Sequence, residues 1–453
     1  SPSHARPVAP PWRHNVLVNV VQDSWHRQVV FQQLLHPPPH QREELGLLHH
    51  AAAYDNALRR QDTDDIHQAE GQVVRLQRPG WVVRQQRLTP LPPTLLQSRS
   101  SRQPLQTVAV VGASDTPGRV GYAVVRNLVS GGFQGHIYPV NPARKKINGI
   151  RAFPDLVSIG ETIDLAVVAT PIETAQAVIQ DCAKAAVDSA IVLSAGGKEI
   201  GTDGERIEKE LLETARQNCL RIIGPNCVGI ISAAAKLNTS FLDRMPPAGD
   251  IAFISQSGAM CLAILDRAAR DRIGFRHFVS IGSMLDVDFG DMLNHCGGDS
   301  AVRAIVLYVE NITNARKFMS AARAVSRVKP VIVLKAGRSQ AGAAAAYSHT
   351  GALAGADDIY RAAFARAGIT QVETTEELFD CTELLAKQPL PAGPRLAVIT
   401  NGGGPGVMAM DAIERMGLES ARLSSETMAR LDAVLPAFWS HGNPCLLYTS
   451  PSP

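Results

Sequence analysis

One histidine lies in surroundings that favour phosphoryl chemistry. His349 belongs to the loop at residues 347–355 (YSHTGALAG), directly after the small residues 341–346. Small neighbours leave an imidazole accessible, and near neutral pH it is largely unprotonated, so its nitrogen can attack a phosphoryl group. Most isolated histidines are structural, but only five of the 13 lie outside residues 1–106. We therefore predict that His349 is a catalytic residue.

An acidic residue could orient that imidazole. Glu310 follows an apolar run in the segment LYVEN, where a buried strand would reach its carboxyl end. A carboxylate there can accept a hydrogen bond from the second ring nitrogen of a histidine and so fix its tautomer. Since the spacing alone fits an exposed glutamate at a strand end equally well, Glu310 as a second catalytic residue is a hypothesis.

Two segments between an apolar strand and a helix could bind an anion. They are SQSGA, residues 255–259, and NGGGPG, residues 401–406. Free amides and the dipole at a helix start favour a negative charge, and two such starts facing each other would surround one phosphate. A serine nucleophile is the weaker interpretation, because the G-x-S-x-G pattern is not met. The predicted phosphate-binding residues are Ser257, Gly258, Ala259, Gly403 and Gly404.

A glycine loop at residues 110–121 (VVGASDTPGRVG) also suits a phosphate. Its spacing is not G-x-G-x-x-G, and the second strand ends on YPVNP instead of on an acidic residue that would bind a ribose diol. The basic run at residues 144–146 fits a nucleotide with an extra phosphate, such as coenzyme A. A structural glycine turn and a site for a nicotinamide dinucleotide in an oxidoreductase remain alternatives.

Two further loops, VATP at 168–171 and GPNC at 224–227, would lie on the same sheet edge as the glycine loop. Three loops on one edge make a groove for an extended ligand. Asn226 alone also fits a turn-capping role. The predicted cofactor-binding residues are Gly112, Ala113, Ser114, Pro117, Gly118, Val140, Asn141, Pro142, Lys145, Thr170, Pro171 and Asn226.

The elements that must position these loops alternate between strands and helices. From Thr107 onward, runs such as TVAVV, LAVV and AIVL are nearly continuous in apolar residues and are separated by helical patterns. RIIGPNCVGI is expected to form the fifth strand, and the pattern restarts at Asp250 and again at Arg395. This predicts an α/β fold with doubly wound parallel sheets. The expected domains are a Rossmann-like domain at 107–244, a flavodoxin-like domain at 245–390 and the truncated start of a third at 391–444.

The two ends of the chain differ from the rest. Residues 1–106 contain no Lys, Met or Cys, but they hold 12 of the 29 Pro and carry the whole basic surplus of the chain. We interpret this segment as a disordered extension or, preferably, as a non-native one. The tail at 445–453 (CLLYTSPSP) is expected to be artefactual.

Composition excludes several classes of protein. No run of 18 apolar residues or secretion signal is seen, and the net charge of +3 gives no reason to expect nucleic acid. The seven cysteines have no metal-binding spacing and suggest reduced thiols. We expect a cytoplasmic protein without a metal site in these residues.

The motifs resemble, in order, those of the acyl-CoA synthetase (NDP-forming) superfamily, which includes succinyl-CoA synthetase and ADP-forming acetyl-CoA synthetase. The resemblance covers residues 107–444 and is closest to long single-chain forms, some of them fused to a GNAT acetyltransferase. The matching segments are GASDTPGRVG, VNP, VATP, GPNC, ISQSGA, DVDFGD, LYVEN, SHTGALAG and TNGGGPG.

This resemblance implies a reaction and its partners. Acyl-CoA and phosphate would give an acyl phosphate and coenzyme A. His349, with Glu310 as its partner, would take the phosphoryl group and carry it to ADP on an ATP-grasp domain, where ATP and Mg would bind. That domain is not found in these residues, so another part of the protein or a separate subunit would supply it. An oligomer is expected.

Two points leave alternatives open. Ser283, Met284 and Leu285 depart from the usual family pattern, which would affect the shape of the acyl pocket. A relative fused to an acetyltransferase could also use these domains to sense CoA or acyl-CoA as the regulatory part of a protein lysine acetyltransferase. The presence of His349 favours ligase chemistry.

Overall fold

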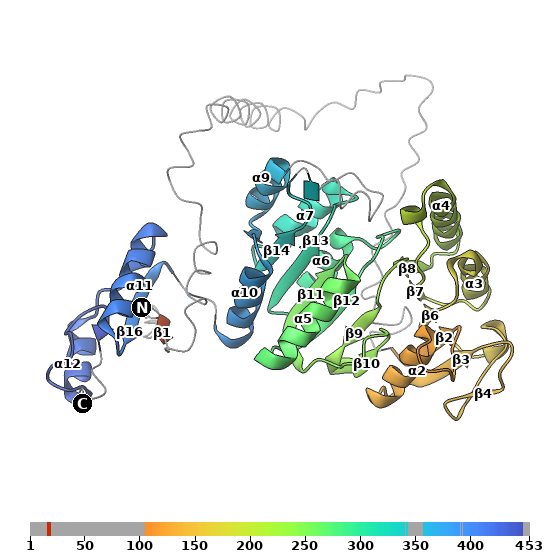
Figure 1. The fold of residues 1–453 in the computed structure, drawn as a ribbon, viewed down its shortest axis with the longest axis horizontal. Helices are drawn as coiled ribbons and strands as arrows, with labels where there is room; N and C mark the ends of the chain where they lie inside the picture. The colour runs from red at the N-terminus through yellow and green to blue at the C-terminus, as the bar shows by residue number, and fades with distance from the viewer. Residues whose placement is uncertain are drawn as a thin grey trace, which may run out of the picture. The chain divides into compact units, whose positions relative to one another are not determined.

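The structure is a computed structural model, and its parts are described separately. It divides into two compact units, one of residues 90–390 and one that combines residues 1–89 with 391–453 (Figure 1). The predicted catalytic residue His349, with the rest of its loop, lies outside the described residues. The described residues are 105–339, 341–342, 357–389, 391, 393–446 and the backbone of 16–19.

The first sheet of residues 90–390 has five parallel strands in the order β3-β2-β6-β7-β8. All four residues of β6 and of β7 are buried, as expected for a parallel sheet covered on both faces. Side chains of β2 alternate between the two faces: Val108 and Val110 pack into one hydrophobic cluster, and Ala109 and Val111 into another. The elements are β2 (Thr107–Val111), α2 (Val120–Ser130), β3 (His136–Val140), β6 (Leu165–Val168), α3 (Ile172–Lys184), β7 (Ser189–Val192), α4 (Thr202–Gln217) and β8 (Arg221–Ile223).

The second sheet has seven strands in the order β10-β9-β12-β11-β13-β14-β15. Strand β9 pairs antiparallel with both its neighbours, and the remaining pairs are parallel. Helices α5 and α10 cover one face, and α6, α7 and α9 cover the other (Figure 1). The elements are β9 (Ile230–Ser232), β10 (Leu237–Asn238), β11 (Ala248–Ser255), α5 (Gly258–Asp271), β12 (Phe275–Ser280), α6 (Phe289–Gly298), β13 (Ala304–Val309), α7 (Ala315–Val325), β14 (Val331–Lys335), α9 (Asp357–Ala367), β15 (Thr370–Val372) and α10 (Thr375–Lys387).

The α/β fold expected from the sequence is confirmed, but the expected fifth strand differs. The run RIIGPNCVGI contains β8 and ends on Ile230, the first residue of β9, and these two strands belong to different sheets. Gly224 and Asn226 adopt positive φ values of 96° and 54°, so the chain turns between them. The second sheet therefore takes its first strands from residues that precede position 245.

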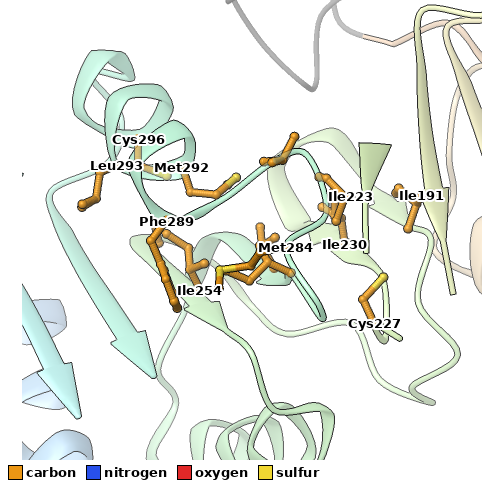
Figure 2. Close-up of a cluster of buried hydrophobic side chains, with 14 of the residues drawn as sticks. Ile191, Ile223, Cys227, Ile230, Ile254, Met284, Phe289, Met292, Leu293 and Cys296 are labelled. Carbon is orange, nitrogen blue, oxygen red and sulfur yellow. The ribbon is translucent and has the colours of Figure 1, made fainter. Parts of the chain in front are cut away.

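The two sheets share one hydrophobic core. Ile191 of β7 and Ile223 of β8 belong to the same cluster as Ile254 of β11 and Phe289 of α6. Figure 2 shows these side chains around Met284. Because a close-packed interior resists displacement, the carboxyl edges of the two sheets are fixed relative to each other.

The other unit contains a smaller sheet around β16 (Arg395–Thr400). Strand β16 pairs in parallel with β1 (Val16–Asn19), β17 (Glu419–Ser420) and β18 (Cys445–Leu446). Helices α11 (Gly403–Arg415) and α12 (Ser425–Val434) follow it in the chain. Leu396, Val398 and Ile413 form the small core.

Some features can be excluded for the described part of the chain. There, no helix is both long and apolar enough to cross a membrane. Nor do three or more His, Cys, Asp or Glu side chains gather in a way that could hold a metal ion. All seven cysteines are free, and all but Cys219 are buried.

Candidate functional site

The carboxyl edge of the first sheet contains a topological switch point. Strand β2 lies between β3 and β6. The chain therefore passes from β2 to β3 on one side of it and then crosses to β6 on the other side. Ligands of open α/β sheets bind at this position. Gly112, which follows β2, has a φ of 84°, and a Cβ there would lie 2.8 Å from Thr170 Cγ2 and 2.9 Å from the Ala169 carbonyl oxygen. The close approach of the β2 and β6 loops therefore requires glycine.

The start of α2 packs directly on this loop. A Cβ on Gly121 would lie 2.0 Å from the Gly112 carbonyl oxygen. The N-cap residue Arg119 makes no side-chain capping hydrogen bond, which leaves backbone N–H groups of the first turn suited to an anion. Ser114 Oγ accepts a hydrogen bond from the Thr116 backbone N–H at 3.0 Å and shapes the turn, while Pro117 and Gly118 are exposed.

Asn141 replaces the acidic residue of a dinucleotide site. Its Nδ2 donates to the Ala113 carbonyl oxygen at 2.8 Å, and its Oδ1 accepts from the Ala143 N–H at 2.9 Å. Asn141 thus joins the loops after β2 and β3, with Val140 buried behind it and Pro142 exposed beside it. Lys145 is exposed immediately before the hairpin of β4 (Lys146–Ile147) and β5 (Ile150–Arg151).

Ser194, which sequence analysis did not identify, connects the next two loops. Its hydroxyl donates to the Thr170 carbonyl oxygen at 2.5 Å, and its own carbonyl oxygen accepts from the Asn226 N–H at 2.8 Å. Thr170, Pro171 and Asn226 consequently lie along one edge, as expected from the sequence. Pro171 is the N-cap residue of α3, and both Pro171 and Asn226 are exposed.

The second sheet presents the start of α5 at its carboxyl edge. Ser255 ends β11; its hydroxyl accepts from the Ser257 N–H at 3.0 Å and donates to the Ser257 carbonyl oxygen at 2.9 Å. Ser257 is the N-cap residue, and its Oγ accepts from the Met260 N–H at 3.3 Å. Gly258 and Ala259 form the first turn. The hydroxyl of Ser257 therefore acts as a helix cap, which supports an anion site more than a nucleophile.

Gln256 links this helix start to Glu310. Its Oε1 accepts from the N–H groups of Glu310 at 2.6 Å and Asn311 at 2.9 Å, and its Nε2 donates to Asn311 Oδ1 at 2.7 Å. Glu310 directly follows β13 and is only 9% exposed. The expectation that Glu310 lies at the carboxyl edge is confirmed. Gln256 was missed as a site residue because its partners are more than 50 positions away.

Charged side chains after β14, on α9 and after β15 form a network of their own. Arg338 Nε lies 3.2 Å from both carboxylate oxygens of Asp357, and Arg361 Nε lies 2.8 Å from Asp357 Oδ2. Both arginines also contact Glu373 Oε1, at 3.1 Å and 2.8 Å. This network connects the segment after β14 with the first turn of α9.

The two edges are joined by the loop at residues 224–228. The Ser283 N–H donates to the Pro225 carbonyl oxygen at 2.9 Å, and the Leu285 N–H donates to the Gly224 carbonyl oxygen at 3.1 Å. A Cβ on Gly258 would lie 2.6 Å from Val228 Cγ2, so the start of α5 packs on this loop. The three residues that depart from the family pattern, Ser283, Met284 and Leu285, therefore form part of the connection between the two edges.

Cys227 lies within this connecting loop but is not suited to thiol chemistry. It is 4% exposed, and its Sγ donates to the Val192 carbonyl oxygen at 3.3 Å. Burial raises the pKa of its thiol to about 12. Because the thiolate is the nucleophile, Cys227 is inert at neutral pH.

The second predicted helix start, in the other unit, uses the same local turn. Thr400 ends β16; its Oγ1 accepts from the Gly402 N–H and donates to the Gly402 carbonyl oxygen, both at 3.1 Å. Gly403 and Gly404 open α11 and are exposed. That this start faces the start of α5 stays a prediction.

Comparisons with known proteins agree with this architecture. A CoA binding domain model matches residues 106–233, and a model of the succinyl-CoA ligase like flavodoxin domain matches residues 248–385. A solved structure from Ca. Korarchaeum cryptofilum, described as a dinucleotide forming acetyl-coenzyme A synthetase 1 in complex with phosphate and ADP, is similar with a TM-score of 0.71 and 38% identity. The match covers 75% of this chain and 74% of that one.

Curated relatives carry the same description. The chain is 42% identical to acetate–CoA ligase (ADP-forming) I of Archaeoglobus fulgidus over 75% of its own length, and spans 49% of that relative. It is 40% identical to the alpha subunit of acetate–CoA ligase (ADP-forming) II of Pyrococcus furiosus, of which it covers 73%. The sequence and both domain matches thus confirm the resemblance, and the chain belongs to the family of ADP-forming acyl-CoA ligases with succinyl-CoA synthetase-like domains.

Proposed function

We propose that this chain carries the CoA-binding and phosphoryl-accepting part of an ADP-forming acid–thiol ligase. Phosphate attacks the acyl carbon of an acyl-CoA, the C–S bond breaks, and coenzyme A leaves with an acyl phosphate as the other product. His349 then attacks the phosphorus of the acyl phosphate, which releases the carboxylic acid. The phosphoryl group finally passes to ADP, and the whole sequence is reversible.

The observation that carries this proposal is the connection between the two carboxyl edges. The loops at Gly112 and Thr170 and the start of α5 belong to sheets with a common core, and residues 224–228 run from one edge to the other. Coenzyme A is proposed to lie along the first edge, near Ser114, Lys145 and Asn226. Its thioester end then reaches the helix start where phosphate is proposed to bind.

The second edge fits the phosphoryl step electrostatically. The backbone N–H groups of Gly258 and Ala259, in the first turn after the N-cap residue Ser257, are proposed as pre-oriented donors for the charge that develops on phosphate oxygens. Glu310 is proposed to accept a hydrogen bond from His349 and fix the tautomer whose free nitrogen attacks phosphorus. Gly403 and Gly404 at the start of α11 are proposed as further phosphate donors.

The transfer of the phosphoryl group to ADP is proposed to take place on a further part of the enzyme. The chain spans about half the length of the Archaeoglobus fulgidus relative, so we propose that an ATP-grasp domain or subunit completes the enzyme. ADP or ATP with Mg would bind there. The acyl substrate is proposed to be a short carboxylic acid, with acetate as the default. We propose a cytoplasmic oligomer.

Labelling with an acyl phosphate tests the proposal without the ATP-grasp part. The chain is incubated with acetyl [32P]phosphate, and acid-labile, base-stable label is expected on a histidine. His349→Ala should abolish the label, while His136→Ala, a change at an exposed histidine, should retain it. Label that persists in His349→Ala would refute the assignment. CoA binding without any label in the wild-type chain would favour the regulatory alternative.

A further inference from the structure

The segment after β12 covers the outer edge of the first sheet. Strand β8 lies at one end of the strand order of that sheet, so its outward backbone groups need partners from elsewhere. The Val287 N–H donates to the Ile222 carbonyl oxygen at 3.1 Å, and the Ile222 N–H donates to Asp286 Oδ2 at 3.0 Å. Residues 283–287 thus run antiparallel to residues 222–225, and a side-chain carboxylate takes the place of one backbone acceptor.

An ion pair fixes Asp286 to the first sheet. Arg221 is the first residue of β8, and its Nε lies 2.7 Å from Asp286 Oδ2. The two side chains are only 20% and 15% exposed, so water and salt screen their attraction less than at the surface. The apolar core between the sheets is non-directional, whereas this pair has a fixed geometry. It therefore fixes the position of Asp286 along β8.

The same acidic segment, DVDFGD at residues 286–291, is also fixed to helices of the second sheet. Asp288 is the N-cap residue of α6 and lies 3.2 Å from Lys317 Nζ of α7. Asp291, in the first turn of α6, is bonded by the same ammonium and lies 3.5 Å from Arg221 Nη2. A motif without a role in the chemistry proposed above therefore links the first sheet to two helices of the second.

The other end of the segment lies at the carboxyl edge of the second sheet. The Ile281 N–H donates to the Ser255 carbonyl oxygen at 2.9 Å, two residues before the cap of α5. Two residues further on, the Ser283 N–H reaches the Pro225 carbonyl oxygen in the loop at the first edge. Because Asp286 lies only three residues beyond Ser283, its place along β8 sets where Ser283 meets that loop.

We propose that Asp286 and Arg221 are positioning residues whose ion pair sets the register of residues 283–287 along β8, and thereby the separation of the two carboxyl edges. The inference rests on the proposed function, in which a thioester at the first edge meets phosphate at the second. Displacement of reacting groups by about 1 Å can slow a reaction by about 100-fold. The register therefore governs the rate even where each ligand still binds to its own edge.

Acyl transfer between the two edges measures this role and does not require phosphorylation of His349. The full chain is given acetyl phosphate and CoA. The thiol sulfur attacks the acyl carbon, the C–O bond to the phosphoryl group breaks, and acetyl-CoA forms with inorganic phosphate while the thiol proton passes to solvent.

The decisive variant combines Arg221→Met with Asp286→Leu. It replaces the ion pair with apolar side chains, a change that often leaves stability intact. The double variant should lower kcat for acetyl-CoA formation by about tenfold or more, with KM for CoA and for acetyl phosphate within about twofold of the wild-type values. A loss of folded protein alone would not separate kcat from KM in this way.

Two further variants separate positioning from the loss of an ion pair as such. Arg276→Met removes an arginine of β12 whose Nε lies 3.1 Å from Asp299 at the end of α6, and it should leave kcat unchanged. Asp286→Asn keeps an oxygen for the Ile222 N–H and should lower kcat less than the double variant does. A wild-type kcat in the double variant, or an equal fall in Arg276→Met, would overturn the inference.

Amide hydrogen exchange tests the ion pair without any catalysis. The N–H groups of Ser283 and Leu285 should exchange about tenfold faster in the double variant, while that of Ile254 inside β11 should be unchanged. If the double variant does not fold, Asp286→Asn takes its place and should show a smaller increase. Absence of acetyl-CoA formation in the wild-type chain contradicts the proposed function, whereas unchanged exchange at Ser283 contradicts the role of the ion pair.

Discussion

The two large sheets of this chain use their carboxyl edges differently. The edge of the first sheet brings together Gly112, Thr170 and Asn226, with Lys145 exposed to solvent, and its hydrogen bonds connect backbone to short polar side chains. The edge of the second sheet buries the charged residues Glu310 and Lys335. The proposed function assigns the extended ligand to the first edge and the phosphoryl step to the second.

This difference fits the tasks that are proposed for the two edges. At the first edge, Gly112 has no room for a Cβ because Thr170 and the Ala169 carbonyl oxygen of the next loop approach it closely. A phosphoryl acceptor needs fixed charges in a site with little water, where electrostatic interactions are strong. If the two edges have separate tasks, substitutions at one should spare the function of the other.

The largest expected effect is at the charged edge. Glu310→Gln should lower the rate of His349 labelling by about 100-fold, because the acceptor that orients the imidazole is lost. CoA affinity, measured by titration calorimetry, should be unchanged. The matched control is Glu210→Gln, at a surface pair with Arg206, which should affect neither quantity. Unchanged labelling would remove Glu310 from the mechanism.

At the edge of the first sheet, the sharpest change is Gly112→Val. Its side chain would collide with Thr170 at a backbone φ of 84°, so the dissociation constant for CoA should rise about tenfold or more, which is about 1.4 kcal/mol. Labelling from acetyl phosphate should persist. Gly149→Val has a similar φ of 78° with no atom within 4 Å of its Cβ, and it should bind CoA normally. Equal loss in both variants would mean that backbone strain alone is measured.

A smaller effect is expected at the residue that ties the α5 start to Glu310. Gln256→Ala leaves two N–H groups without their acceptor and should slow labelling by about fivefold to tenfold. Gln256→Glu keeps an acceptor oxygen and should recover part of the rate. Gln176→Ala, which removes a side-chain bond of 2.8 Å between α3 and α4, serves as control. If Gln256→Ala and Gln176→Ala slow labelling equally, the link between Gln256 and the residues after β13 has no specific role.

The smallest effect on function is expected from the buried histidines His277 and His295, which take no part in the proposed site. Their effect should instead appear in the stability of the fold. Burial lowers the pKa of His295 to about 4 and also lowers that of His277, whose Nε2 lies 2.9 Å from Asp299. Since unfolding restores an ordinary pKa near 6.5, the unfolded chain binds more protons between pH 6.5 and 4. The free energy of unfolding should therefore fall as pH falls through this window.

Urea unfolding at pH 7, 6 and 5 measures this dependence. His295→Leu should flatten it, while CoA binding at pH 7 remains unchanged. An equally steep decline in the variant would assign the pH dependence to other groups.

The sequence predicted those parts of the site that depend on neighbours in the chain. The strand before Gly112, the Ser257 cap and the position of Glu310 all follow from apolar runs and the residues that end them. The loop at 224–227 was expected, but the entry of the following residues into a second sheet was not, because apolar residues on both sides of the loop are typical of a single strand. Ser194 was missed as well, since its partners Thr170 and Asn226 lie in loops that follow other strands.

The most direct test of the division between the two edges uses inorganic phosphate. The chain is incubated with [32P]phosphate, with or without acetyl-CoA and other short acyl-CoAs, and label on His349 is quantified. Label should appear only when an acyl-CoA is present, because the first edge must present the thioester to phosphate at the second. Gly112→Val should lose this label while retaining the label from acetyl phosphate. A chain that binds CoA and accepts label from acetyl phosphate, yet gains none from phosphate with any acyl-CoA, would contradict the account.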